Sequence, residues 1–253
     1  MTTASVGLQL YTVRDIFAQD PLATLTRAAR LGFAGVEFAG YGGLDSARLR
    51  RELDALGLAA PASHVSIERL TNAPDAELAY AAELGVGTVV APYARFDDPD
   101  AWTRLAETLE DLAQRSALLG MQLAYHNHAH EIRERVGEVR VLDHLLERAP
   151  AIGAELDLAW IEAGGADPVD YLERYAGRVP LIHLKDYRPT EHDGDSTVEL
   201  GTGVVDLDAA LAAAERTGVP WIILEQDHCP GDAFASVEQN LAWYRDASHA
   251  APG

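Results

Sequence analysis

Four short apolar runs of this 253-residue chain each end in an acidic or imidazole side chain. The first run, Met121 to Ala124, leads into the segment Tyr-His-Asn-His-Ala-His-Glu at residues 125–131, which contains His126 and His128. The polar groups that end the other three runs are Asp157, His183 and Glu225. Carboxylates and imidazoles bind divalent ions, and an imidazole with its usual pKa of about 6.5 also moves protons at neutral pH. The pattern therefore indicates a metal-assisted acid–base site.

Asp157, His183 and Glu225 form a mixed oxygen and nitrogen ligand set. Such a set suits Mn²⁺, Mg²⁺, Co²⁺ or Zn²⁺ and does not select among them. Each residue also has a purely structural interpretation. Asp157 could cap the following helix, and His183 could be a hydrogen-bonded core histidine. Glu225 could form an ion pair with Arg14 or Lys185. We prefer the metal interpretation because three successive strand ends would need three independent structural reasons.

The elements that must position these groups recur regularly. Between the apolar runs lie helix signals: Asp20-Pro21 opens a segment that ends at Leu31-Gly32, and Asp206 opens another that ends at Thr217-Gly218. Eight short buried strands alternating with helices imply a parallel sheet, and in this chain length they match a closed barrel whose rim gathers the strand ends. The eight runs are Val6 to Leu10, Gly35 to Phe38, Leu58 to Ala62, Thr88 to Ala91, Gln122 to Tyr125, Ala154 to Leu158, Leu181 to Leu184 and Trp221 to Leu224.

We therefore predict an α/β protein with one (β/α)₈ TIM-barrel domain over residues 1–253. A doubly wound open sheet is the alternative, but it normally carries a glycine-rich phosphate loop after its first strand, where this chain reads Gln-Leu-Tyr-Thr-Val-Arg-Asp at 9–15. Gly201-Thr202-Gly203 follows no predicted strand. The longest polar connection, Tyr187 to Val205, lies on the expected site rim, and its length predicts a functional or mobile loop.

The charge of the chain argues against polyanionic partners. It has 40 Asp and Glu against 20 Lys and Arg, a formal net charge of −20, and no local basic strip, so no binding to nucleic acid is expected. The single cysteine, Cys229, cannot form an internal disulfide, and no signal-like segment opens the sequence, so we expect a cytoplasmic protein. No apolar run approaches the roughly 20 residues that a membrane helix needs, so no membrane role is expected.

Motifs along nearly the whole chain resemble those of one protein family. They are Gly7-Leu8-Gln9-Leu10-Tyr11-Thr12-Val13-Arg14-Asp15, Gly35-Val36-Glu37-Phe38, Ser63-His64-Val65, Tyr-His-Asn-His at 125–128, Glu155-Leu156-Asp157-Leu158-Ala159-Trp160, His183-Leu184-Lys185-Asp186, Gly201-Thr202-Gly203-Val204-Val205-Asp206 and Glu225-Gln226-Asp227. On these motifs the chain resembles the sugar phosphate isomerase/epimerase family of the xylose-isomerase-like TIM barrel superfamily. The set is specific for the superfamily and poorly specific for a substrate.

The resemblance implies a metal-dependent barrel in which strands five to eight supply Glu, Asp, His and Glu ligands. Asp157, His183 and Glu225 match the last three, and His126 stands where the first carboxylate is usual. Strand alternation leaves Tyr125 as the alternative at that place. The expected cofactor is one divalent ion, Mn²⁺, Mg²⁺, Co²⁺ or Zn²⁺, which polarises the carbonyl of a sugar or polyol and stabilises the enediolate formed by deprotonation of the adjacent C–H.

The outcome of that enediolate separates two reaction classes. Reprotonation would make the protein a sugar isomerase or epimerase, our first prediction, whereas loss of a β-leaving group would make it a lyase or dehydratase acting on a keto-inositol or 3-keto-glycoside. Related epimerases use two metal-bound glutamates as opposed bases, so His126 favours one-base chemistry in which His128 or Glu225 takes the proton. A non-catalytic sugar-binding barrel is a further alternative. Three-zinc DNA-repair endonucleases, which share the superfamily, are disfavoured by the charge and by Ala91-Pro92-Tyr93 in place of a histidine.

Lys185 completes the expected catalytic set of His128, Lys185 and Glu225. It lies two residues beyond His183, so strand alternation puts both side chains on the same side. Its ammonium is expected to stabilise the enediolate, and pairing with Asp157 or Glu225 is the structural alternative.

Four residues are expected around a substrate that we prefer to be an unphosphorylated sugar, inositol or keto-sugar. Glu37 and His64 end the second and third strands, where they could bond sugar hydroxyls, and Glu37 could also join the metal. Trp160 is expected as an apolar wall and Arg188 as an anchor for an anionic group. Barrels of this kind often pair through helices or rim loops, so a homo-oligomer stays open.

Overall fold

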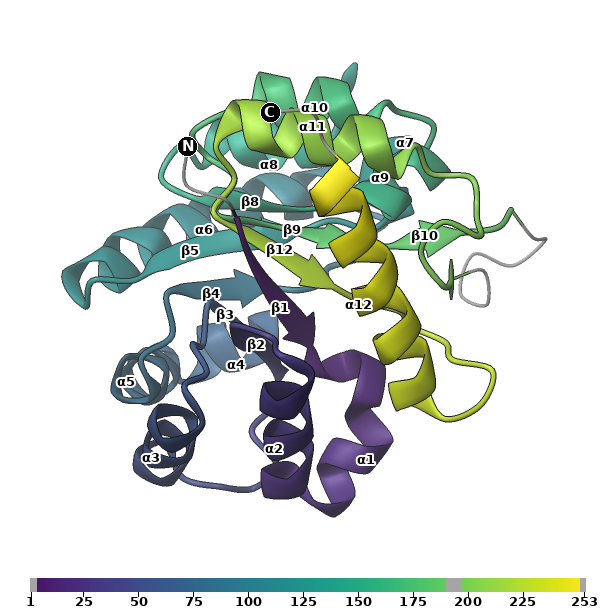
Figure 1. The fold of residues 1–253 in the computed structure, drawn as a ribbon. Helices are drawn as coiled ribbons and strands as arrows, with labels where there is room; N and C mark the ends of the chain where they lie inside the picture. Colours follow the sequence, from purple (N-terminus) through teal and green to yellow (C-terminus); the bar gives the residue numbers. More distant parts are fainter. Residues whose placement is uncertain (1–3, 190–196, 251–253) are drawn as a thin grey trace.

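The computed structural model describes residues 4–189 and 197–250, which form a closed barrel of eight parallel strands. The order around the barrel is β1-β12-β9-β8-β5-β4-β3-β2, and every neighbouring pair is parallel. The predicted (β/α)₈ fold is confirmed (Figure 1). The strands are β1 (Ser5–Gln9), β2 (Gly35–Ala39), β3 (Ala62–His64), β4 (Thr88–Ala91), β5 (Gln122–His126), β8 (Gly153–Asp157), β9 (Leu181–Leu184) and β12 (Trp221–Leu224).

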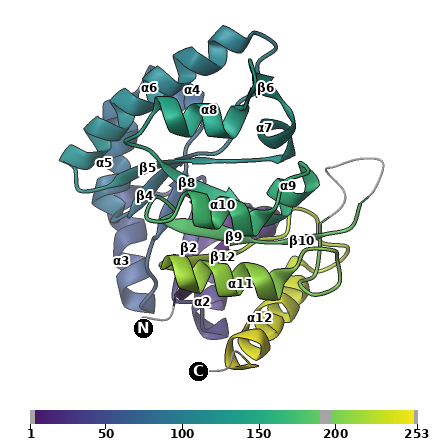
Figure 2. The same cartoon turned by 90° about the horizontal axis from the view of Figure 1, so that it is seen from above.

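Helices surround the barrel, and α7 and α9 lie beside β10 at the carboxyl ends of the strands (Figures 1 and 2). The helices are α1 (Arg14–Gln19), α2 (Pro21–Leu31), α3 (Ser46–Leu56), α4 (Ile67–Asn72), α5 (Pro74–Leu84), α6 (Pro99–Leu118), α7 (Ala129–Arg133), α8 (Val141–Arg148), α9 (Leu158–Ala163), α10 (Pro168–Arg174), α11 (Leu207–Thr217) and α12 (Ala233–Ala250), with a 3₁₀ helix, η1, at Leu10–Val13. Two hairpins pair β6 (Arg135–Val136) with β7 (Val139–Arg140) and β10 (Asp186–Tyr187) with β11 (Thr197–Val198). Among the described residues, none of the helices is both long enough and apolar enough to span a bilayer.

The helix signals read from the sequence act as expected in α2. The Asp20 side chain accepts a hydrogen bond from the Ala23 N–H, and Pro21, which has no N–H to leave unpaired, stands in the first turn. Gly32 ends the helix with a φ of 91°, a backbone conformation that other residues rarely adopt. The predicted limits of α2 are confirmed, and Asp206 and Gly218 delimit α11 in the same way.

The third strand differs from the sequence prediction. The apolar run Leu58 to Ala62 was expected to form it, but β3 covers Ala62–His64. Pro61 has no N–H to donate to a neighbouring strand, and before it only Ala59 pairs, in an isolated bridge to Gly35. The correction places His64 at the end of the strand itself.

The inside of the barrel changes from apolar to polar along the strands. A small interior cluster consists of Ala62, Val90, Ala124, Leu181 and Ile223. Because side chains two residues apart on a strand point to the same face, the next inward positions of four of these strands lie directly beyond the cluster. Those positions carry His64, His126, His183 and Glu225. The apolar layer therefore forms the floor on which the polar side chains stand.

The connection after β9 is fastened by one buried carboxylate, that of Asp186. Its oxygens accept the backbone N–H groups of Gly201 at 3.0 Å, Gly203 at 2.8 Å and Val205 at 3.1 Å. A Cβ at Gly203 would collide with the Asp186 carboxylate and with the Tyr187 carbonyl, so the close approach requires glycine. The Gly-Thr-Gly turn thus encloses an acidic side chain of its own chain. Residues 190–196 of the predicted long loop lie outside the described residues.

Candidate metal and acid–base site

Three potential ion ligands meet at the carboxyl ends of β8, β9 and β12, and one lysine joins them. We call Asp157, His183, Glu225 and Lys185 the rim group. The Lys185 Nζ lies 2.9 Å from Asp157 Oδ2 and 2.9 Å from Glu225 Oε2. The His183 Nδ1 lies 2.7 Å from Glu225 Oε2 and 3.9 Å from Asp157 Oδ2. The structure thus brings three of the four predicted ligands together with Lys185 at the sixth to eighth strands of the barrel, and their role as metal ligands stays a prediction.

A second group lies beside the first inside the barrel and consists of Glu37, His64, His126 and Glu155, which we call the deep group because both of its carboxylates are fully buried. The His64 Nε2 lies 3.0 Å from Glu37 Oε1 and 3.2 Å from both carboxylate oxygens of Glu155. The His126 Nδ1 lies 3.8 Å from Glu155 Oε1. Both glutamates are fully buried, and no lysine or arginine is among their described ion-pair partners.

His183 connects the two groups through its two ring nitrogens. While Nδ1 faces Glu225, Nε2 lies 2.7 Å from Glu37 Oε2 and also contacts Glu155. The imidazole is fully buried, so its orientation is fixed by these carboxylates. A carboxylate on one nitrogen of a histidine is the usual device for directing the other nitrogen to a metal ion.

Opposite charges keep the rim group ionised around Lys185. Burial lowers the pKa of the Lys185 ammonium, but Asp157, Asp227 and Glu225 raise it, and the net result is a pKa well above the usual value. Burial raises the pKa of Glu225, while Lys185 and His183 bring it well below its usual range. For Asp157, burial outweighs the same cations and raises the pKa to about 6. One buried ammonium therefore forms ion pairs with several carboxylates.

The histidines divide into two kinds. Burial lowers the pKa of His64, but Glu155 and Glu37 raise it to about 10. The pKa of His126 is well below 6.5 and that of His128 falls to about 3, mainly because both rings are buried and lie near other cations. His126 and His128 are consequently neutral at pH 7 and keep a lone pair for an ion or a proton.

Both groups have buried ligand atoms that are suited to a cation. In the described parts of the chain, four such atoms find no aligned hydrogen-bond donor or acceptor. Two belong to the rim group, His183 Nδ1 and Asp157 Oδ2, and two to the deep group, Glu37 Oε1 and His126 Nδ1. Three of them lie within 3.0 Å of an oppositely charged group, whereas the nearest carboxylate oxygen to His126 Nδ1 is 3.8 Å away, and leaving such a buried atom unpaired costs about 1–3 kcal/mol. The residues present therefore fit a divalent ion.

The structure separates His126 from the ligands with which the sequence grouped it. His126 shares a ligand cluster with His64, Glu155 and His183, whereas Asp157, His183 and Glu225 form another. Tyr125, the alternative at this place, points away from the barrel interior and donates its hydroxyl to Glu131 at 2.8 Å. The strand register thus favours His126 as the inward residue.

The other predicted site residues lie at different depths. The ring of His128 lies 6.2 Å from that of Trp160, whose indole is 5.3 Å from the Lys185 Nζ, so both border the rim group. Glu37 and His64 lie in the deep group. Arg188 stands apart on an exposed connection, where its Nε donates to the Thr202 carbonyl at 2.9 Å.

Two residues of the site were missed from the sequence. Glu155 precedes Asp157 by two residues on the same strand, so strand alternation alone places both side chains inside the barrel. Asp227 follows Glu225 by the same interval and lies 2.8 Å from the Lys185 Nζ. The composition of the chain also draws attention to this site. Lys185 is the one lysine among the 20 Lys and Arg residues, and it is 1% exposed.

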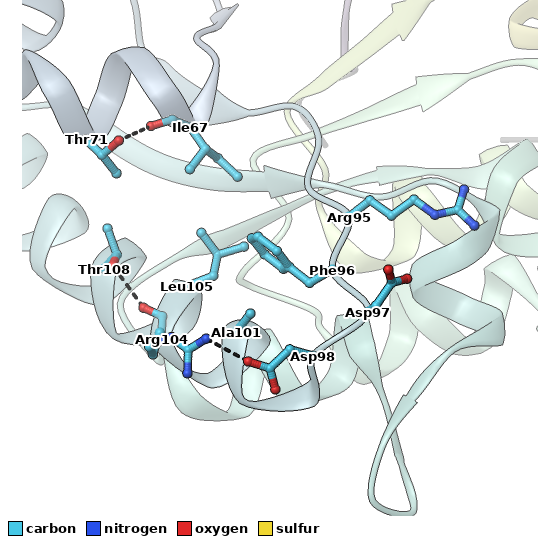
Figure 3. Close-up of a pocket in the computed structure, with 10 residues that line it drawn as sticks. All are labelled: Ile67, Thr71, Arg95, Phe96, Asp97, Asp98, Ala101, Arg104, Leu105 and Thr108. Carbon is cyan, nitrogen blue, oxygen red and sulfur yellow. Dashed lines mark hydrogen bonds and ion pairs between the residues drawn. The ribbon is translucent and has the colours of Figure 1, made fainter.

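A surface groove of about 640 Å³ lies elsewhere, between α4, α6 and the loop that precedes α6 (Figure 3). Within it Arg104 pairs with Asp98 at 2.8 Å, and Arg95 lies 3.7 Å from Glu134 outside the groove. Phe96 and Leu105 provide much of its apolar wall (Figure 3). None of the residues that line it belongs to the rim or deep group.

Comparisons with known proteins find relatives of this chain. The chain is 32% identical over 164 residues to the inosose dehydratase of Geobacillus kaustophilus, which covers 56% of this chain and 50% of that protein. It is 28% identical over 247 residues to the rhizopine catabolism protein MocC of Rhizobium meliloti. This match covers 83% of this chain and 75% of that protein. The chain thus spans about half the length of the inosose dehydratases that it matches.

Solved structures show the same architecture. A sugar phosphate isomerase/epimerase from Parabacteroides distasonis superposes with a TM-score of 0.81 at 21% identity, covering 98% of this chain and 99% of that one. The IolI protein with a bound zinc atom superposes with a TM-score of 0.76 at 16% identity, covering 96% of both chains. The family description "xylose isomerase-like TIM barrel" matches residues 25–247. The chain therefore belongs to the xylose isomerase-like TIM barrel family.

Proposed function

We propose that this protein is a lyase that dehydrates a keto-inositol or a similar cyclic keto-polyol. A base removes the proton next to the ketone, the C–H electron pair becomes the C=C bond of an enediol, and the β-hydroxyl then leaves as water after receiving a proton. The named relatives support elimination, since several of them are called inosose dehydratases. The isomerase or epimerase activity predicted from the sequence shares the first step and stays a prediction.

The observation that carries the proposal is the buried Lys185 ammonium among Asp157, Glu225 and Asp227. Enolate formation places negative charge on the ketone oxygen, and a fixed cation in a water-poor site stabilises that charge far better than water does. A divalent ion held by Asp157, His183 and Glu225 would add Lewis-acid polarisation of the same carbonyl. A barrel that only bound sugar would have no use for this arrangement.

We assign the proton transfer to His128 on its position, because its Nδ1 is buried without a hydrogen-bond partner among the described residues and its ring lies beside Trp160. Burial and nearby cations lower its pKa to about 3, so this role requires that the bound substrate raise that pKa toward neutrality. Glu225 is a weaker candidate because Lys185 and His183 hold its carboxylate in ion pairs. A single base suits elimination, whereas symmetric epimerisation needs a base on each face of the substrate.

The substrate side of the site favours a neutral ring. The Trp160 Nε1 is buried without a partner in the described part of the chain, so its N–H could donate a hydrogen bond to a substrate hydroxyl. The candidate phosphate anchors are engaged: Arg14 donates to the Tyr11 and Asp227 carbonyls and Arg188 to the Thr202 carbonyl. We therefore expect a polyol without a phosphate group.

The test is to incubate the purified protein, loaded with Mn²⁺, with an inosose, a 3-keto-glycoside or a ketose in deuterated water, and to follow the products by NMR. Deuterium incorporation coupled to loss of water from the inosose is the expected result. Exchange followed by an isomer that retains all its hydroxyls would replace the lyase with an isomerase. Binding without exchange for every compound would leave a sugar-binding barrel.

A further inference from the structure

We infer that the deep group is a second, zinc-type metal site, in which His64 Nε2, His126 Nδ1 and Glu155 Oε1 are ligands and Glu37 Oε1, 3.0 Å from the His64 nitrogen, is the candidate fourth. This site is separate from the rim group, and the inference does not depend on which reaction the protein catalyses. It gives a role to His126, which stands where the resemblance implies a carboxylate, and to Glu155.

The spacing of the four atoms suits a small tetrahedral ion. Zinc bonds to histidine nitrogen and carboxylate oxygen are about 2.0–2.1 Å long, so two tetrahedral ligands are separated by about 3.3 Å. The His64 Nε2 lies 3.0 Å from Glu37 Oε1 and 3.2 Å from Glu155 Oε1. The His126 Nδ1 lies 3.8 Å from the same Glu155 oxygen. Shifts of a few tenths of an ångström would bring all three separations to the tetrahedral value.

Two of these atoms also point to a ligand independently of the spacing. Glu37 Oε1 and His126 Nδ1 have no aligned hydrogen-bond partner among the described residues, and their side chains are 0% and 4% exposed. The His126 nitrogen is the stronger of the two indications, because its nearest carboxylate oxygen is 3.8 Å away and an ion would satisfy it.

Charge balance favours a divalent ion in the deep group as well as in the rim group. Asp157, Glu225 and Asp227 carry three negative charges and Lys185 one positive charge, which leaves −2 beside the rim. Glu37 and Glu155 also carry −2, and their described partners are the imidazoles of His64 and His183, whose raised pKa values show that protons stand where an ion would compete. One divalent ion at each place would neutralise each group.

His183 would serve both ions without bridging them. Its Nδ1 faces the rim group, and its Nε2–H can donate to Glu37 Oε2 at 2.7 Å, leaving Glu37 Oε1 for the deep ion. The histidine nitrogens of the deep group favour Zn²⁺ or Co²⁺ over Mg²⁺, which prefers oxygen ligands. The carboxylate-rich rim group has no such preference.

The test is metal analysis of His126→Gln and Asp157→Asn beside the wild type, after loading with Zn²⁺ and removal of loose ions on a chelating resin. His144→Gln is the matched control, since His144 lies on α8 and bonds Thr103 outside the barrel. We expect about two ions in the wild type and in the control, and about one in each site variant. Circular dichroism establishes folding, and His64→Gln replaces His126→Gln should the latter fail to fold.

Cobalt gives a readout that is independent of activity, because tetrahedral Co²⁺ absorbs visible light far more strongly than octahedral Co²⁺. The tetrahedral bands should persist in Asp157→Asn and vanish in His126→Gln. A single ion that is lost in Asp157→Asn and kept in His126→Gln would overturn the deep site and leave the proposed reaction intact. A single ion with the opposite behaviour would support the deep site, and a wild type without metal would overturn both sites.

Discussion

The rim and deep groups each take one carboxylate from β8, and the two carboxylates behave in opposite ways. Glu155 and Asp157 are two residues apart, point into the same barrel and are both fully buried. Burial raises both pKa values, yet His183 and His64 bring that of Glu155 to about 2, whereas that of Asp157 stays raised at about 6. Equal burial therefore gives different pKa values, because the number and closeness of the cationic neighbours decide the outcome.

The two groups also differ in their access to a substrate. In the rim group Glu225 is 5% exposed and its neighbour Asp227 has a side chain that is 25% exposed, so solvent and substrate reach its edge. The glutamates of the deep group are fully enclosed. We therefore expect rim variants to change mainly catalysis and deep variants to change mainly stability and metal content.

The strongest test of this division is replacement of Lys185. In Lys185→Met the fixed cation is lost, and we expect inosose turnover to fall about a thousandfold because the developing oxyanion loses its stabilising charge. Lys185→Arg should be nearly as inactive, since Lys185 is 1% exposed and a larger guanidinium would displace the three carboxylates that lie 2.8–2.9 Å from its Nζ. Steady-state kinetics measures both effects, and Arg216→Met, which removes an exposed ion pair with Glu173, is the control. An active Lys185→Met enzyme would remove Lys185 from the mechanism.

Glu155→Gln should show the opposite bias and act mainly on stability. It removes a buried carboxylate from two histidines, and breaking such a pair on one side costs about 4 kcal/mol of unfolding free energy. Urea denaturation of the chelator-treated protein measures this loss. The exposed pair Arg50–Asp54 supplies the comparison, because Asp54→Asn should cost less than about 1 kcal/mol. Equal losses in the two variants would contradict the importance of the deep group.

The pH dependence of stability should distinguish the two carboxylates in protein freed of metal. Because the folded-state pKa of Asp157 is raised to about 6, its stabilising contribution is present below the unfolded value near 4 and is lost as pH rises through 6. Asp157→Asn should abolish that loss, of the order of 3 kcal/mol, between pH 4 and 7. The lowered pKa of Glu155 acts only as pH falls from about 4.5 through 2, and its effect on the histidines begins near their unfolded value of about 6.5, so Glu155→Gln should leave the slope around pH 5 unchanged. The midpoints of urea unfolding of both variants and the wild type, measured between pH 4 and 7, test these expectations.

The smallest effect is expected in the surface groove. Arg104→Ala removes an exposed ion pair with Asp98 and enlarges the groove without touching either group. Turnover should stay within about twofold of the wild type and the metal content should not change. A marked loss of activity would make the groove part of the functional surface and would weaken the division into rim and deep groups.

Much of the fold was predictable because local signals and the hydrophobic pattern agree. Asp20, Pro21 and Gly32 delimit α2 in the sequence and in the structure alike. The third strand was misplaced because the apolar run of residues 58–62 contains Pro61, whose missing N–H limits pairing in a way that hydrophobicity alone does not reveal.

The rim group was predictable because each of its members follows a separate apolar run. Its division from the deep group was not, since the depth of a side chain in a barrel depends on how far its strand extends relative to its neighbours. His126 at the end of β5 pairs with Glu155, in the middle of β8, and not with Asp157 at the end of that strand. The register between β5 and β8 therefore determines which carboxylate His126 meets.

The presence of Lys185 as the one lysine of the chain has a practical consequence for labelling chemistry. Amine-selective reagents and lysine-specific proteases have a single side-chain target here, and it is 1% exposed within the folded barrel. Apart from any terminal amine, added mass or a single cut after Lys185 would report opening of the site. The rate of such a reaction, followed by mass spectrometry with and without substrate, would turn this residue into a built-in reporter of how often the barrel mouth opens.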